Sequence, residues 1–364
     1  MERCPMNVTT DIFRCNSSRT PMECYLVLRG PAQTVIAVLC CAVGSLCILE
    51  NSLVLYLIFS SPKIRQKPSY LFLSSLALAD TLASVIFTCS FVHFHVFAGT
   101  DSSKEAFLLK LGGVNVAFTA SLGSLLLMAF DRYICICKPS SYKALVTKRR
   151  AVATLVGLWV VVVALASFPL LGWNCCSFDS ACSELFPFIE NTYLSSWIAL
   201  VAVLVAAIVY AYTYVLWKAR QHVLYMEKHQ VQSGQQNTKM RLDIMLAKTL
   251  VVVMVVLVAC WSPALVLMTY STFAPLGEFI KKVFAFCSTF CLVNSMVNPA
   301  IYALRSKELN ASLRRVFSCC RKKPGISESC LEVESTQKTF PIENVCDELI
   351  GSGPVPCSRT YPLA

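Results

Sequence analysis

The residues of this sequence that could do chemistry are polar and ionisable side chains inside long apolar segments. Asp80 is the clearest of them, because it lies about ten residues into the apolar segment 70–96 and so near the middle of a membrane-spanning helix. A charged group at that depth is costly unless it has partners, and it therefore indicates a functional site. Oxygen-bearing side chains that suit a small hard cation lie at similar depth in other apolar segments. They are Asn51, Ser121, Asn294, Ser295 and Asn298.

Two interpretations of Asp80 stay open. In the first, this residue binds a cation or a proton, and the occupancy of the site depends on the conformation of the protein. In the second, Asp80 is hydrogen-bonded by neighbouring polar side chains and has no further role.

A second candidate is Asp131-Arg132-Tyr133, directly after the third apolar segment. Arg132 either marks the cytoplasmic edge of the membrane, where basic residues are enriched, or forms an ion pair. Asp243 is the one acid near the inner end of the sixth apolar segment, and an Arg132–Asp243 pair would tie two helices together. Such a pair is typical of a conformational switch, because breaking it lets the sixth helix move.

The sequence shows no arrangement typical of an enzyme, a metal centre or a transporter. Its 20 cysteines form no paired CxxC arrays with zinc spacing. His93 and His95 are two positions apart, so on a helix they are expected to point to different faces, which disfavours a shared metal ion. Internal repeats of the kind found in transporters are not visible.

The elements that must position these residues are seven apolar segments, long enough or nearly long enough to cross a bilayer as helices. Only 15% of the 364 residues are charged, against about 25% in soluble domains. This composition excludes a disordered chain and fits a soluble enzyme poorly. We therefore expect an all-α membrane protein, a seven-transmembrane helix bundle with kinks at Pro263 and Pro299. The segments are 34–59, 70–96, 111–130, 151–171, 193–217, 249–273 and 283–304.

The net charge of +11 is unevenly distributed along the chain. The segments on one predicted side of the membrane hold 22 of the 32 Lys and Arg, and the other side holds eight. Because cytoplasmic loops are enriched in basic residues, the N-terminus is predicted to be extracellular and the C-terminal tail cytoplasmic. Anionic lipid and a cytoplasmic protein partner then account for the charge, and no nucleic acid is expected.

Four regions are expected from this topology: an extracellular segment 1–33, a transmembrane bundle 34–304, an amphipathic membrane-surface helix 305–320 and a disordered cytoplasmic tail 321–364. Asn7 and Asn16 are glycosylation acceptors on the outer side, and an unused sequon is the alternative for each. Cys319 and Cys320 follow the amphipathic segment, where cysteines are often palmitoylated, with free thiols as the alternative.

Six landmarks together resemble the rhodopsin-like G-protein-coupled receptors over residues 34–317. Each is weak alone, but they occur in the order and on the segments typical of that family. The landmarks are Asn51, LALAD ending at Asp80, Asp131-Arg132-Tyr133, Trp159, CWSP at 260–263 and NPAIY at 298–302.

Two departures from the wider family resemble the cannabinoid receptors. Phe107 stands where the third segment usually carries a cysteine, and the fifth segment lacks the usual proline. The strings KPSYLFLSSLALAD and NSMVNPAIYALRS are also similar to cannabinoid receptors, and the short N-terminal segment resembles type 2 more than type 1. The second outer loop contains Cys175, Cys176 and Cys182. The resemblance implies a disulfide within this loop, between Cys175 and Cys182.

The resemblance also implies a ligand pocket. Val114 stands where amine receptors carry an acid, and Lys110 is followed by Leu111 rather than by the acid of lysophospholipid receptors. By resemblance, Lys110 contacts polar groups of the ligand. The alternative is that its side chain extends toward the membrane interface. The implied pocket residues are Phe87, Phe91, Phe94, His95, Lys110, Val114, Phe118, Phe186, Tyr193, Trp197, Trp261, Met268, Phe284 and Ser288.

Such a pocket, mostly apolar with a few polar groups, suits a long uncharged lipid amide or ester. Ser288 and His95 are expected to donate hydrogen bonds to the ligand. Phe118 and Trp261 would pack beneath it as a switch. For any single aromatic residue the alternative is ordinary packing between helices.

Taken as a whole, the resemblance implies a receptor for endocannabinoids such as 2-arachidonoylglycerol and anandamide. It would be a plasma-membrane protein that couples to Gi/o and inhibits adenylate cyclase, with receptor kinases and arrestin acting on Ser335, Thr336 and Thr339. The alternatives are a receptor for another lipid, of the lysophospholipid type, and a type 1-like paralogue. The implied switch and G-protein residues are Asp131, Arg132, Tyr133, Tyr210, Asp243, Trp261, Asn298, Pro299 and Tyr302. An allosteric sodium ion, the one cofactor expected, would bind at Asp80, Ser121, Asn294 and Asn298.

Overall fold

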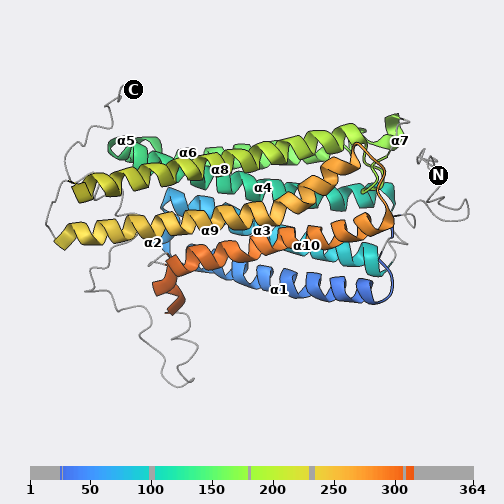
Figure 1. The fold of residues 1–364 in the computed structure, drawn as a ribbon, viewed down its shortest axis with the longest axis horizontal. Coiled ribbons are helices and arrows are strands. Elements are labelled where there is room, and N and C mark those ends of the chain that lie inside the picture. Colours follow the sequence, from blue (N-terminus) through green and yellow to red (C-terminus); the bar gives the residue numbers. More distant parts are fainter. Residues whose placement is uncertain are drawn as a thin grey trace, which may run out of the picture.

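The structure is a computed structural model of the chain, and it describes residues 25–26, 28–97, 103–178, 182–228, 234–305 and 309–314. Seven long helices lie side by side along one axis and form a bundle (Figure 1). They are α1 (Pro31–Ser60), α3 (Pro68–Val96), α4 (Lys104–Cys137), α6 (Lys148–Ser167), α8 (Asn191–Lys228), α9 (Gly234–Ser271) and α10 (Glu278–Arg305). Three short helices lie between them: α2 (Pro62–Arg65), α5 (Pro139–Leu145) and α7 (Cys175–Phe178).

All seven long helices are long and apolar enough to cross a membrane, so the predicted seven-helix bundle is confirmed. Most of them extend beyond the apolar segments seen in the sequence. The helix α4, for example, begins at Lys104 rather than at residue 111 and ends at Cys137 rather than at residue 130. Charged residues near helix ends can reach the polar membrane interface, so an uncharged segment understates the length of the helix.

The helix starts follow local sequence signals. Proline is the first residue of α1, α2, α3 and α5, a position where its missing N–H group costs no hydrogen bond. Two helices begin instead with a side-chain cap. The Ser103 hydroxyl accepts a hydrogen bond from the Ala106 amide at the start of α4, and Thr147 caps α6 through the Arg150 amide.

The helix α3 is central, because it packs against both α1 and α4. The helix α4 also contacts α8, α9 lies between α8 and α10, and α10 closes the ring against α1. Small residues allow close approach of helices in membranes. A Cβ atom added at Gly44 of α1 would lie 2.2 Å from the Thr88 hydroxyl oxygen of α3, so glycine is needed for this contact.

The two ends of the bundle differ. The helix α7 lies at one end, and α2 and α5 lie at the other (Figure 1). Apolar side chains such as Leu49, Val156 and Val203 are exposed on the flanks of the bundle, which suits contact with lipid chains. Beyond α10, residues 309–314 are helical, and Leu309 is completely buried in the core.

Several predicted sites fall on residues that the structure does not describe. The glycosylation sites Asn7 and Asn16, the palmitoylation sites Cys319 and Cys320, and the tail residues Ser335, Thr336 and Thr339 lie outside the described ranges. The backbone of Asp243 and Tyr302 is helical, but their side chains are not described.

Candidate functional site

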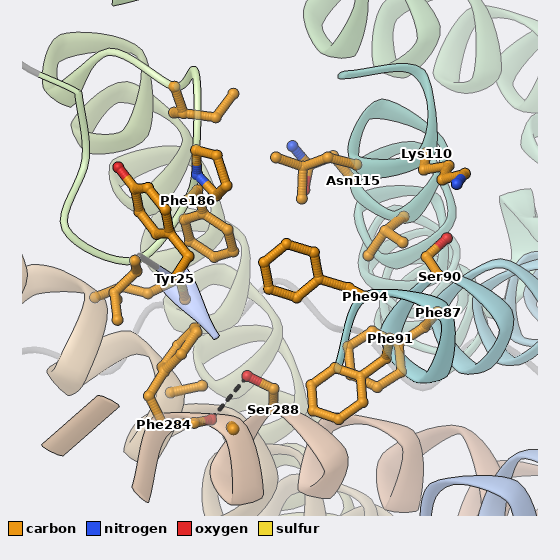
Figure 2. A pocket seen from close by; sticks show the side chains of 18 of the residues that line it. Tyr25, Phe87, Ser90, Phe91, Phe94, Lys110, Asn115, Phe186, Phe284 and Ser288 are labelled. Carbon is orange, nitrogen blue, oxygen red and sulfur yellow. Dashed lines mark hydrogen bonds between the residues drawn. The ribbon is translucent and has the colours of Figure 1, made fainter. Parts of the chain in front are cut away.

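A cavity of about 200 Å³ lies among α3, α4, α8, α9, α10 and the loop that precedes α8. All fourteen residues that the sequence assigned to a ligand pocket are in its lining. Figure 2 shows aromatic side chains from α3, α10 and the loop around the cavity, with the polar side chains of Asn115 and Lys110 on one side. The lining is therefore mostly apolar, with isolated polar groups.

Helical periodicity explains how three helices deliver these side chains. On α3, Phe87, Phe91 and His95 are four residues apart and lie on one face. The rings of Phe87 and Phe91 stack with centroids 5.1 Å apart, and the His95 ring lies 4.4 Å from that of Phe91. Residues at intervals of three and four on α4 (Phe107, Leu111, Val114, Phe118) and on α10 (Lys281, Phe284, Ser288, Cys291) line the cavity in the same way.

The floor of the cavity is an aromatic pair from two helices. The rings of Phe118 on α4 and Trp261 on α9 meet edge to face, with centroids 5.4 Å apart. Trp261 is buried, and among the described residues its indole nitrogen has no hydrogen-bond partner. Pro263 lies inside α9 two residues further on, where it removes a backbone hydrogen bond and weakens the helix. Trp261 thus lies next to the part of α9 that this proline weakens.

Ser288 has a different hydrogen-bonding role from the predicted one. Its hydroxyl donates to the backbone carbonyl of Phe284 at 2.8 Å, as the dashed line in Figure 2 indicates. A hydroxyl has one proton and two lone pairs, so in this arrangement Ser288 can only accept a hydrogen bond from a ligand. For Ser288 to donate to a ligand, as the sequence analysis expects, its hydroxyl would first have to leave the Phe284 carbonyl.

The two histidines of α3 both line the cavity, although they are two positions apart. The sequence predicted that His93 and His95 would point to different faces of the helix. The His95 ring lies among aromatic rings, with Phe91 on one side and Phe94 at a centroid distance of 5.0 Å. Among the described residues, its Nδ1 atom is buried without a hydrogen-bond partner.

The mouth of the cavity is formed by the loop before α8 and by the chain before α1. A disulfide joins Cys175 and Cys182 and closes a small ring within this loop. The loop also folds back on itself, because the Cys175 amide donates to the Phe188 carbonyl and the Ser183 amide donates to the Ile189 carbonyl. These bonds hold Glu184 and the residues after it against the cavity.

Phe107 takes up the position where a loop-to-helix disulfide would be expected in most rhodopsin-like receptors. Its ring meets that of Phe188 edge to face at a centroid distance of 5.9 Å. Phe188 has a positive φ of 63°, which a bulky residue adopts only when the surroundings enforce it. An aromatic contact therefore joins α4 to the loop.

Sequence reasoning missed further lining residues, most of them apolar, such as Phe107. The polar ones that it missed are Tyr25, Ser90, His93, Asn115, Glu184 and Lys281. Helical spacing could have found Asn115, which follows Val114, and Lys281, which lies one helical turn before Phe284 and two before Ser288. No sequence signal could have found Tyr25 or Glu184, because their positions depend on how the two loops fold.

Below the cavity, Asp80 is completely buried and accepts three side-chain hydrogen bonds. The hydroxyls of Ser121 and Ser295 donate to its Oδ1 at 2.6 and 2.8 Å, and the Asn298 amide donates to its Oδ2 at 3.0 Å. Asn294 is also buried. Asn51 donates to the Ser295 backbone carbonyl at 3.1 Å and so links α1 to α10. The geometry is compatible with both interpretations of Asp80, the cation site and the hydrogen-bonded aspartate.

At the opposite end of the bundle from the cavity, Asp131 is the centre of a second polar cluster. Ser69 and the Tyr142 hydroxyl each donate to its carboxylate at 2.8 Å, and Arg132 forms an ion pair with it at 2.5 Å. Burial, followed by the nearby Asp131 carboxylate, raises the pKa of Tyr142 to about 12, so the tyrosine remains a donor at neutral pH. In this conformation Arg132 pairs with its neighbour Asp131, and the predicted Arg132–Asp243 contact lies outside the described side chains.

Two further predicted switch residues lie near this cluster. The Tyr133 ring on α4 is 5.4 Å from the ring of Tyr214 on α8. Tyr210 is 72% exposed on the flank of α8, so in this conformation its side chain faces outward rather than into the bundle.

The remaining predicted switch residues that the structure describes lie on α10. Asn298 contacts Asp80, and Pro299 lies inside the helix.

The comparisons agree with this architecture. A family model described as 7 transmembrane receptor (rhodopsin family) matches residues 50–302. The chain therefore belongs to the rhodopsin family of seven-transmembrane receptors and is not an enzyme. As such it is a multi-pass protein of the plasma membrane.

Individual relatives narrow the family further. The chain is 51% identical to cannabinoid receptor 2 of Homo sapiens over 322 residues, which cover 88% of this chain and 89% of the relative. It is 53% identical to cannabinoid receptor 2 of Rattus norvegicus over 302 residues, which cover 83% of each chain. Identity to cannabinoid receptor 1 of Xenopus laevis is 47%, over 86% of this chain and 69% of the relative. Within the rhodopsin family, the chain belongs to the cannabinoid receptors.

Proposed function

We propose that the cavity binds neutral lipid messengers, endocannabinoids such as 2-arachidonoylglycerol and anandamide. The observation that carries this proposal is the lining, in which aromatic and aliphatic side chains surround a few isolated polar groups. A long acyl chain gains by burial against such a surface, and one polar headgroup can be matched by one or two hydrogen bonds. The cannabinoid relatives support the same class of ligand.

A zwitterionic lysophospholipid is the second candidate, and the lining disfavours it. Phosphate recognition needs accessible positive charge, and an ammonium group needs an acid beside it. Lys110 is followed by the apolar Leu111, and the cavity lysine Lys281 is already paired with Glu184 at 2.8 Å. A zwitterionic headgroup that used Lys281 for its phosphate would therefore have to break this ion pair.

We propose that the ligand signals by shifting a conformational equilibrium. An agonist shifts it only as far as it binds the signalling conformation more tightly than the resting one. Phe118 and Trp261 pack together beneath the ligand cavity, and Trp261 lies two residues before Pro263, so a ligand that displaces the indole would favour movement of α9. At the far end, Arg132 would leave Asp131 and engage a heterotrimeric G protein of the Gi/o class, which inhibits adenylate cyclase.

The remaining expectations complete the proposal. The N-terminus would be extracellular and glycosylated at Asn7 or Asn16, and the tail would be palmitoylated at Cys319 or Cys320 and phosphorylated for arrestin binding. A sodium ion would be held by the side-chain oxygens of Asp80, Ser121, Asn294 and Asn298, and the Ser121 hydroxyl can rotate to present a lone pair to it. Such an ion would supply positive charge to a buried carboxylate.

A displacement panel tests the ligand class. Membranes expressing the chain are incubated with a radiolabelled neutral cannabinoid ligand and increasing amounts of 2-arachidonoylglycerol, anandamide or lysophospholipids. We expect displacement by the two endocannabinoids only; displacement by lysophospholipids alone would contradict the proposal. In cells, Arg132→Ala should abolish the agonist-driven fall in cyclic AMP, and ligand binding should remain as evidence that the variant is folded.

A further inference from the structure

An ion pair from two distant parts of the chain lies at the mouth of the cavity. Lys281 at the start of α10 contacts Glu184 of the loop before α8, with Nζ and Oε2 2.8 Å apart. The two residues are 97 positions apart in sequence, and both line the cavity. Their side chains are 20% and 35% exposed, so the pair is partly shielded from water. The pair is part of the ligand site rather than an incidental surface contact.

The position of Glu184 is fixed by its neighbours. The Tyr25 hydroxyl donates to the backbone carbonyl of Ser183, directly before Glu184, at 3.0 Å. Burial raises the pKa of Tyr25, and the nearby Glu184 carboxylate raises it further, so the tyrosine keeps its donor proton. The Cys175–Cys182 disulfide ends two residues before Glu184. The Tyr25 hydrogen bond and the disulfide thus both restrict the backbone next to Glu184, whose side chain contacts Lys281.

Two neighbouring charged residues, Glu190 on the loop and Lys282 on α10, have partners of their own. Glu190 accepts a hydrogen bond from the Trp173 indole at 2.6 Å and lies outside the cavity lining. On α10, Lys282 pairs with Glu278 at 2.8 Å, and neither of these residues lines the cavity. In the described lining, Glu184 is the one acidic residue.

Neutral lipid messengers differ from their hydrolysis products at the headgroup alone. An arachidonoyl ester or amide and the free fatty acid share the same acyl chain, so the apolar lining cannot tell them apart. A partly buried lysine would favour the acid strongly, because carboxylates form charge-assisted hydrogen bonds with ammonium groups. Specificity against the fatty acid therefore needs a group that neutralises the charge of the lysine or repels the carboxylate of the acid.

We propose that Glu184 is this element: by pairing with Lys281 at the cavity mouth, it makes the ligand site select neutral lipids and exclude free fatty acids. The inference rests on the proposed neutral-lipid function and deepens it. Removing the charge of Glu184 would leave Lys281 available to the carboxylate of a fatty acid. Tyr25 is a positioning residue for this exclusion, because it holds the loop that carries Glu184.

The experiment measures displacement of a radiolabelled neutral cannabinoid ligand by arachidonic acid and by its ethanolamide. In Glu184→Gln, the apparent affinity for the acid should rise about tenfold or more, since an added charge-assisted contact of roughly 1.4 kcal/mol corresponds to tenfold. The affinity for the neutral ethanolamide should change by less than about threefold and reports that the variant is folded. The double variant Glu184→Gln/Lys281→Gln should lose the gain for the acid.

Glu278→Gln is the matched control, because it releases Lys282 next to Lys281 but outside the cavity. An unchanged ratio of acid to ethanolamide affinity in Glu184→Gln would overturn the inference. So would an equal gain in Glu278→Gln, because it would show a long-range charge effect rather than a contact in the site. If the unaltered receptor binds no neutral lipid at all, the proposed function itself fails, and the specificity claim fails with it.

Discussion

At the scale of single residues, this receptor has to satisfy hydrogen-bonding groups where water is scarce, and Ser288 is an informative case. Its proton is committed to the Phe284 carbonyl, so only its lone pairs are available to a ligand. Ser288→Ala should therefore weaken the binding of anandamide, which carries a hydroxyl donor, by about fivefold, or about 1 kcal/mol. The N-ethyl amide of the same fatty acid lacks that hydroxyl and should lose much less.

Competition binding of both amides, measured on the unaltered receptor and on Ser288→Ala, gives this difference. Ser262 is the matched control, because its hydroxyl makes the same kind of bond to the carbonyl four residues earlier but is exposed on α9, away from the cavity. Ser262→Ala should leave both affinities unchanged. Equal losses for the two amides in Ser288→Ala would show that Ser288 does not recognise a ligand hydroxyl.

Asp80 is a buried carboxylate that also needs hydrogen-bonding partners in place of water. Ser121, Ser295 and Asn298 replace the water that it would have at the surface, and a cation can replace one or more of them. In Asp80→Asn the negative charge is absent, so sodium chloride should no longer change agonist affinity. The check is agonist competition with and without added sodium at constant ionic strength.

Glu50 provides the control for this experiment, because it is the other acid within the predicted spans and is only half-buried on α1. Glu50→Gln should keep the sodium effect. If sodium still weakens agonist binding to the Asp80→Asn receptor, the cation site lies elsewhere and Asp80 is a hydrogen-bonded structural residue.

The residues around Asp80 and in the cavity also show what the sequence could predict. Ser121, Ser295 and Asn298 were predictable, because depth along an apolar helix translates directly into depth in the bundle. Tyr25 and Glu184 were not, since no periodicity governs a loop whose path depends on a disulfide and on backbone hydrogen bonds. The proton of Ser288 could not be assigned either, because sequence does not determine which acceptor a hydroxyl chooses.

At the scale of elements, the loop before α8 is the least regular part of the site, and its shape depends on one covalent link. The Cys175–Cys182 disulfide closes a ring of a few residues, which by loop entropy contributes about 2–3 kcal/mol to the ordering of the loop. Replacing either cysteine by serine should release Glu184 and Phe186 from the mouth and abolish ligand binding. Saturation binding, together with surface labelling of the receptor, distinguishes lost binding from lost expression.

Cys41 is a suitable control for this loop experiment, because it is a free and exposed cysteine on α1. Cys41→Ser should bind ligand normally. Normal binding by the Cys175→Ser or Cys182→Ser receptor would mean that the loop keeps its shape without the link.

The elements also differ in how well their ends could be predicted. Proline at the first helical position and serine or threonine caps determine several helix starts and are visible in the sequence. The extension of α4 back to Lys104 was not predicted, because the search for uncharged segments stops at the first lysine. Hydropathy therefore locates the apolar core of each span rather than its ends.

At the scale of the whole molecule, charge and architecture together predict the orientation of the receptor in the membrane. The short helices α2 and α5, which carry Lys63, Arg65 and Lys143, lie at the end of the bundle opposite the cavity (Figure 1). Lys148 and Arg150 begin α6 beside them. Because basic loops are retained in the cytoplasm, this end should face inward and the cavity should open on the extracellular side.

Epitope tags test this orientation. A tag placed before Met1 should be labelled by antibody on intact cells, whereas a tag after Ala364 should be labelled only after the cells are permeabilised. Gln substitution of Lys148, Arg149 and Arg150 together should change this pattern little, because the basic residues are spread over several loops and each loop contributes separately to the orientation. Labelling of the C-terminal tag on intact cells would reverse the assignment. The Asp131 cluster, rather than the lipid cavity, would then lie outside, where no G protein could reach it.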